Sequence, residues 1–71
     1  MQPENHIVDP ESLRLARLRR RLLQRDVASK LGVAPQRLSD FENGLRHPTQ
    51  EQATALVGLL GRDILVGEVG S

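Results

Sequence analysis

The sequence contains no cysteine, tryptophan or tyrosine, and Phe41 is its only aromatic residue of the Phe, Trp and Tyr class. Without cysteine the chain can form neither a disulfide nor a thiolate metal site, and it is compatible with a reducing cytoplasm, where we expect it to reside. Its hydrophobic core must consist almost entirely of Leu, Val, Ile and Ala. In 71 residues such a core is small, which suits one domain of short packed helices.

Long hydrophobic runs are also absent. No apolar stretch approaches the roughly 20 residues of a membrane-spanning helix, so we expect no membrane partner. The N-terminal residues, MQPENHIVDPES, lack the charged start and apolar stretch of a secretory signal. The two histidines are far apart in the sequence, and no carboxylate pair has a pocket to hold it. We therefore expect no enzyme activity, no cofactor and no metal.

The net charge of +1 conceals an uneven distribution. Residues 12–47 carry nine basic side chains against three acidic ones, a net charge of +6, whereas both flanking segments are net acidic. A positive segment can attract DNA phosphates, although arginine clusters are more often simply solvated. The neighbouring sequence motif favours the first interpretation.

Residues 24–44, QRDVASKLGVAPQRLSDFENG, are typical of two short helices joined by a tight turn. We expect the first over about residues 24–31, ended by Gly32, because glycine readily adopts the left-handed conformation. The second begins near Pro35, whose fixed φ suits a first helical turn, and stops at the Asn-Gly pair. Apolar side chains at helical spacing would lock the two helices together: Val27, Ala28, Leu31, Leu38 and Phe41.

This pattern resembles the helix-turn-helix of the phage-repressor family, the Cro/cI-like or XRE proteins. The matching residues are Gln24, Val27-Ala28, Leu31-Gly32-Val33, Leu38-Ser39 and Glu42-Asn43-Gly44, with Pro48 just beyond. The similarity covers about residues 13–61, and its joint spacing is specific although no single residue is. It implies an all-α domain of four to five helices that binds double-stranded DNA.

The resemblance also assigns roles to three residues that connect helices. Gln24 matches a glutamine that faces phosphate at a helix N-terminus and can brace a base-reading glutamine, here Gln36. Arg17 and Glu42 match an arginine and a glutamate that tie the first helix to the end of the third. A partly buried pair of this kind can form a bidentate bond, and each partner alone would be costly.

The exposed side of the helix from Pro35 carries the candidate base readers. Gln36 can bond adenine, Arg37 can bond guanine, and Asp40 can accept from cytosine. A carboxylate is repelled by phosphates, however, so Asp40 could instead restrain Arg37. Pro35 occupies a reading position of the family but offers only an apolar contact to thymine. The remaining DNA-binding candidates are Arg25, Asn43 and Arg46, for phosphate, and Ser39, whose small size favours helix packing.

The motif is flanked by two further helix signals within an expected DNA-binding domain of residues 9–61. Asp9 can cap a helix from Pro10 to about Leu22. Thr49 and Gln52 have the spacing of a capping box before a clean amphipathic helix. Residues 1–8 are expected to be a flexible arm, or to pin onto the core through Ile7 and Val8.

Residues 62–71, RDILVGEVGS, form the least predictable segment. Members of the family often place a fifth helix here, but Ile64, Leu65 and Val66 favour a strand. A lone strand is unstable in water, so it would pair with the same tail of a second copy and make a homodimer. The alternative is an apolar tail folded onto its own fourth helix.

These features together indicate a sequence-specific transcriptional regulator, a dimeric repressor whose helix from Pro35 reads the major groove. The alternative is a protein-interaction module or antitoxin-type protein, whose tail recruits a toxin or another regulator through Leu65, Val66 and Val69. Salt separates the two, because DNA binding weakens steeply as salt rises whereas an apolar protein contact does not.

Overall fold

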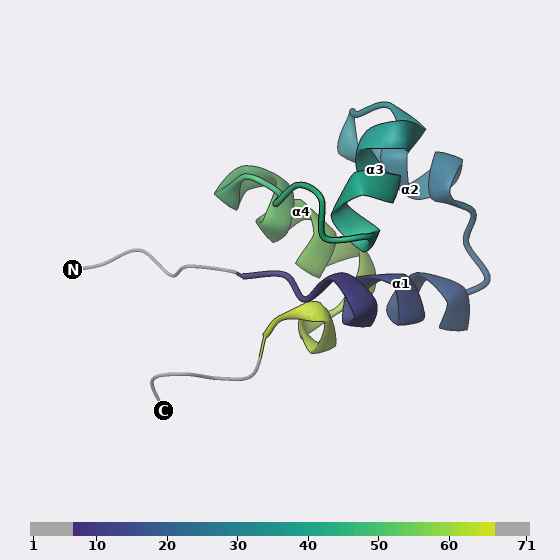
Figure 1. The fold of residues 1–71 in the computed structure, drawn as a ribbon. Helices are drawn as coiled ribbons and strands as arrows, with labels where there is room; N and C mark the ends of the chain where they lie inside the picture. Colours follow the sequence, from purple (N-terminus) through teal and green to yellow (C-terminus); the bar gives the residue numbers. More distant parts are fainter. Residues whose placement is uncertain (1–6, 67–71) are drawn as a thin grey trace.

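The computed structural model describes residues 7–66, which fold into four α-helices and one turn of 3-10 helix. The elements are α1 (Pro10–Arg19), α2 (Gln24–Leu31), α3 (Pro35–Glu42), α4 (Gln50–Leu60) and η1 (Arg62–Ile64). Figure 1 shows α2 and α3 together above α1, with α4 beside them. This confirms the predicted all-α fold. No helix within residues 7–66 is long and apolar enough to cross a membrane.

The core lies where these helices meet, and it is aliphatic apart from Phe41, as the composition predicts. Its buried members are Val8, Leu13, Ala16, Val27, Ala28, Leu38, Phe41, Ala53, Leu56, Leu60 and Ile64. Val8 and Ile64 lie outside the predicted domain of residues 9–61. The core therefore includes one residue from each of the two flanking segments.

Helix α1 begins as predicted and ends earlier than predicted. The Asp9 carboxylate accepts from the Ser12 N–H at 3.0 Å, which caps the first turn. The helix stops at Arg19 rather than near Leu22, because Arg21 adopts a left-handed conformation with φ of 57°. The Leu22 N–H then donates to the carbonyl of Arg17 at 3.1 Å, a bond that closes the helix end.

Helices α2 and α3 have the predicted bounds and meet in the predicted tight turn. Gly32 ends α2 with φ of 80°, and the Val33 N–H donates to the carbonyl of Ala28 at 3.0 Å. Pro35 is the first residue of α3, as expected. Neither helix has a side-chain cap, because Leu23 and Ala34 occupy the capping positions. Their geometry therefore depends on tertiary packing.

The tail corrects our prediction of a strand from Ile64. Residues 62–64 form η1 instead, and the Ile64 side chain is fully buried in the core of its own chain. Leu65 forms a single antiparallel bridge with Val8, so its backbone partner is the N-terminal segment of the same chain. The rest of the predicted arm and tail, residues 1–6 and 67–71, lies outside the described residues.

Helix α4 starts with the capping box that its sequence predicts. The Thr49 hydroxyl accepts from the Gln52 N–H at 3.1 Å, and the Gln52 side-chain oxygen accepts from the Thr49 N–H at 2.9 Å. Each bond satisfies a backbone donor that the first helical turn would otherwise leave without a partner.

Replacing Thr49 by alanine should lower the free energy of unfolding by about 1 kcal/mol, because the cap bond is lost. Thr54→Ala is the matched control, since Thr54 is exposed within the same helix and alanine has the higher helix propensity. Urea unfolding of the three proteins measures both effects. Equal stability of the Thr49→Ala and Thr54→Ala variants would contradict the role of the capping box.

Candidate nucleic-acid interface

Helix α3 has one side locked into the protein and one side facing solvent. Leu38 and Phe41 are buried between the helices, and α3 packs against both α2 and α1. Pro35, Gln36 and Arg37 are exposed along the other side. The residues predicted to contact bases therefore lie on one accessible surface. The opposite side of α3 packs against α1 and α2.

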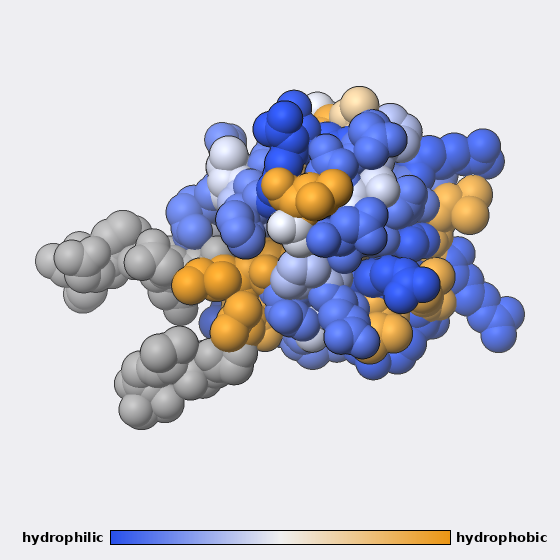
Figure 2. Space-filling model, viewed as in Figure 1, coloured by the Kyte–Doolittle hydropathy of each residue, from blue (hydrophilic) through white to orange (hydrophobic). Residues whose placement is uncertain are grey.

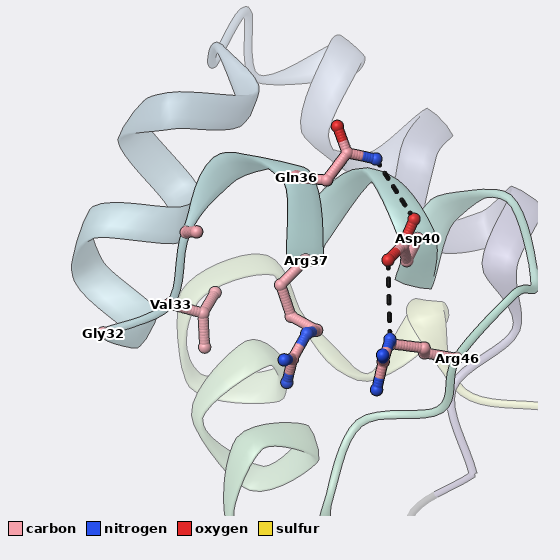
Figure 3. Close-up of a pocket in the computed structure, with 7 residues that line it drawn as sticks. Gly32, Val33, Gln36, Arg37, Asp40 and Arg46 are labelled. Carbon is pink, nitrogen blue, oxygen red and sulfur yellow. Dashed lines mark hydrogen bonds and ion pairs between the residues drawn. The ribbon is translucent and has the colours of Figure 1, made fainter.

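An open hollow of about 450 Å³ lies at the start of α3 (Figure 3). It is lined by Gly32, Val33, Ala34, Gln36, Arg37, Asp40 and Arg46. Figure 3 shows Arg37 and Arg46 extending into the same region from different segments. The Arg37 side chain makes no hydrogen bond or ion pair with any residue between 7 and 66, so its guanidinium is available to an external anion or base.

The Asp40 carboxylate contacts two other candidate DNA-binding residues, Gln36 and Arg46. Its Oδ1 accepts from Gln36 Nε2 at 3.2 Å, and its Oδ2 lies 3.5 Å from Arg46 Nε. We expected Asp40 either to read a base or to restrain Arg37. The structure shows that its partners are Gln36 and Arg46 (Figure 3).

A buried network connects α3 to α1 and α2 behind this surface. Arg17 donates to Glu42 through Nε at 2.6 Å and through Nη2 at 3.1 Å, and the two residues are only 8% and 6% exposed. Arg17 Nη1 also donates to the carbonyl of Leu22 at 2.7 Å. The structure thus forms the bidentate pair that the resemblance implies.

Gln24 belongs to the same network, which changes its expected role. Its Nε2 donates to Glu42 Oε1 at 3.0 Å, whereas the resemblance led us to expect it to brace Gln36. The glutamine is half-buried at the first position of α2, close to the exposed N–H groups of that helix. Its second amide hydrogen and those N–H groups can still bind a phosphate.

The remaining sequence-predicted residues lie at the edges of this surface. Asn43 Nδ2 donates to Ser39 Oγ at 3.3 Å, which fixes the amide at the end of α3. The Arg25 side chain is 76% exposed and lies 3.9 Å from Asp26, a contact too loose to restrain it. Both Asn43 and Arg25 remain free to approach a backbone phosphate.

Leu45 is an exposed apolar residue next to Arg46 that the sequence pattern did not single out. It is 73% exposed between Gly44 and Arg46, directly after α3. A single leucine in a loop produces no periodic signal. Its only sequence clue was its place beside Arg46.

A helix with one buried side, and with amide and guanidinium groups on its exposed side, is typical of a DNA-binding helix-turn-helix protein. A helix-turn-helix family model matches residues 13–66, which is most of the chain. The chain therefore belongs to the Cro/cI-like, or XRE, helix-turn-helix family of DNA-binding regulators. A search of curated proteins found no matching relative.

The buried ion pair of Arg17 and Glu42 should contribute far more to stability than an exposed ion pair of the same length. Glu42→Gln leaves the Arg17 charge buried without a counter-charge, and should lower the free energy of unfolding by about 3 kcal/mol. The exposed pair of Arg19 and Asp63 is also 2.6 Å long, with side chains 62% and 52% exposed.

Asp63→Asn is therefore the matched control, and it should cost less than about 1 kcal/mol. Chemical denaturation monitored by circular dichroism measures both variants. Similar losses in the two variants would show that burial does not set the strength of the Arg17–Glu42 pair.

Proposed function

We propose that this protein is a sequence-specific transcriptional regulator that reads the major groove of DNA with α3 and acts as a dimeric repressor. The observation that carries the proposal is the exposed first turn of α3, formed by Pro35, Gln36 and Arg37, on a helix that buries Leu38 and Phe41. Family membership supports DNA binding, and the arrangement of side chains supports the reading of sequence.

The surface divides into base-reading and phosphate-binding groups. Gln36 and Arg37, at the start of α3, carry the amide and guanidinium that match adenine and guanine edges. Asn43 and Arg46 follow the end of the same helix, and Gln24 with Arg25 lies at the N-terminus of α2. These flanking groups would hold the sugar-phosphate backbone and set the register of α3 in the groove.

A dimer is proposed because one domain of this size can neutralise only a few phosphates. Two copies on half-sites about one helical turn apart would bind much more tightly and would read twice as many bases. Repression is the simplest outcome, since two bound copies cover the DNA that polymerase needs.

The proposed dimer contact is the apolar surface at Ile7, Leu65 and Val66. Of the three tail residues predicted to pair across the dimer, Ile64, Leu65 and Val66, Ile64 is instead buried in the core of its own chain. The Val66 N–H donates to the carbonyl of Ile7 at 2.8 Å, so these two residues are neighbours, and their side chains are 46% and 56% exposed. Figure 2 shows that apolar patches of this kind interrupt an otherwise hydrophilic surface.

Val66→Asp should shift a dimer toward monomer, because a carboxylate would lose solvation in an apolar contact. Leu18→Asp is the matched control, since Leu18 on α1 is also 46% exposed and lies outside the proposed contact. Light scattering of the protein with duplex DNA measures the number of bound copies. A Val66→Asp variant that still binds as a pair would exclude this contact surface.

Alanine substitutions of the base-reading residues and of the phosphate-binding residues should affect DNA binding in different ways. Arg37→Ala, like Gln36→Ala, should relax the preference at one base by about 1–3 kcal/mol. Arg46→Ala should weaken binding to all sequences and reduce the salt dependence by about one phosphate contact.

Arg19→Ala serves as the charge control, because Arg19 lies on α1 and pairs with Asp63 rather than with the α3 surface. Titrations of specific and scrambled duplexes at several salt concentrations separate these effects. If no duplex binds even at low salt, the protein-interaction alternative is favoured instead.

A further inference from the structure

Asp40 is the acidic side chain on the accessible side of α3, since Glu42 is buried. A carboxylate at that place opposes phosphate binding, so its presence calls for an explanation. We infer, on the basis of the function proposed above, that Asp40 is a positioning residue. It holds Gln36 in the orientation that reads adenine, and it couples this base contact to the phosphate contact of Arg46.

The first support is the geometry of the three side chains. Figure 3 shows the carboxylate between Gln36 and Arg46, with one oxygen directed to each. The two distances are 3.2 Å to Gln36 Nε2 and 3.5 Å to Arg46 Nε. The Asp40 side chain is 19% exposed and that of Arg46 is 58% exposed, so DNA meets the partners more readily than the carboxylate.

The second support is the chemistry of the Gln36 amide. A carboxylate only accepts hydrogen bonds, so Gln36 must turn its nitrogen, and not its oxygen, toward Asp40. One amide hydrogen is then used, which leaves the second N–H and Oε1 for a base. This edge matches adenine, which offers an N6 donor next to the N7 acceptor. Guanine presents two acceptors, N7 and O6, and would leave Oε1 facing an acceptor.

The third support is the orientation of Arg46. Its Nε faces Asp40, which leaves the two terminal NH₂ groups directed to other partners such as a phosphate. The backbone N–H of Arg46 also donates to the backbone carbonyl of Asp40 at 3.4 Å. Backbone and side chain therefore both connect Arg46 to α3. A phosphate held by Arg46 thereby fixes the carboxylate that orients Gln36.

The test is Asp40→Asn, which keeps the size of the side chain but adds an N–H donor. The Gln36 amide could then adopt either orientation, because the substituted side chain at position 40 could both donate and accept a hydrogen bond. Duplexes are selected from a random pool by the wild type, Gln36→Ala and Asp40→Asn, and base preferences are compared at each position. Wild type should prefer adenine over guanine by about tenfold or more at the position that Gln36→Ala releases. Asp40→Asn should reduce that preference to less than about threefold.

Asp26→Asn is the matched control, because Asp26 is a half-exposed carboxylate on α2 that lies near Arg25 instead of Gln36. Both substitutions remove one negative charge, so both should strengthen binding to DNA of any sequence. Only Asp40→Asn should reduce the preference for adenine over guanine. In the Gln36→Ala background, Asp40→Asn should have no further effect at that position. Thermal unfolding of each variant confirms that the fold is intact.

Three results would overturn the inference. The first is an adenine preference that survives Asp40→Asn. The second is a cytosine preference that Asp40→Asn removes and Gln36→Ala leaves intact, since Asp40 would then be a base reader itself. The third is the absence of any enriched sequence with the wild type, which would also contradict the proposed function. The first two results leave that function standing.

Discussion

The buried hydrogen bonds between Arg17 and Glu42 hold the rest of this structure in place. Arg17 is near the end of α1, Glu42 is the last residue of α3, and Gln24 joins them from the start of α2. Helices α2 and α3 have no side-chain caps, so packing and this network must fix their relative position. The accessible side of α3 can present side chains accurately only because its far end is anchored to two other helices.

The same network explains how a strongly basic segment can fold without a large core. Of the charged side chains in residues 12–47, Arg17 and Glu42 are the two that are buried, and they neutralise each other. The other basic groups remain at the surface, where water and DNA phosphates can solvate them. In the folded protein Arg17 therefore has a structural role, whereas the other basic side chains of this segment are exposed and can bind DNA.

Local signals explain why much of the fold could be predicted. Gly32 and Pro35 mark the turn between α2 and α3, and the spacing of Thr49 and Gln52 marks the start of α4. The end of α1 was mispredicted because its left-handed residue is Arg21 and not a glycine. The tail was mispredicted because Ile64 is stabilised by core contacts that are distant in sequence. Its β-branched side chain was then a poor guide to local structure.

The sequence indicated which side chains α3 would expose, but it did not indicate the contacts among them. The four-residue spacing of Gln36 and Asp40 on one helix could have indicated their hydrogen bond. The approach of Arg46 could not be foreseen, because it depends on the left-handed turn at Gly44 after α3. The bond from Gln24 to Glu42 was also not predicted, because it arises from the packing of α2 against α3.

The pairing of Val8 with Leu65 has a consequence for the order in which the domain is made. Both Val8 and Ile64 complete the core, yet they come from opposite ends of the described chain. During synthesis, the four helices emerge before Ile64, which completes the core by packing against α1 and α4. The ribosome must therefore release nearly the whole domain before its core can close, which makes folding a late and cooperative step.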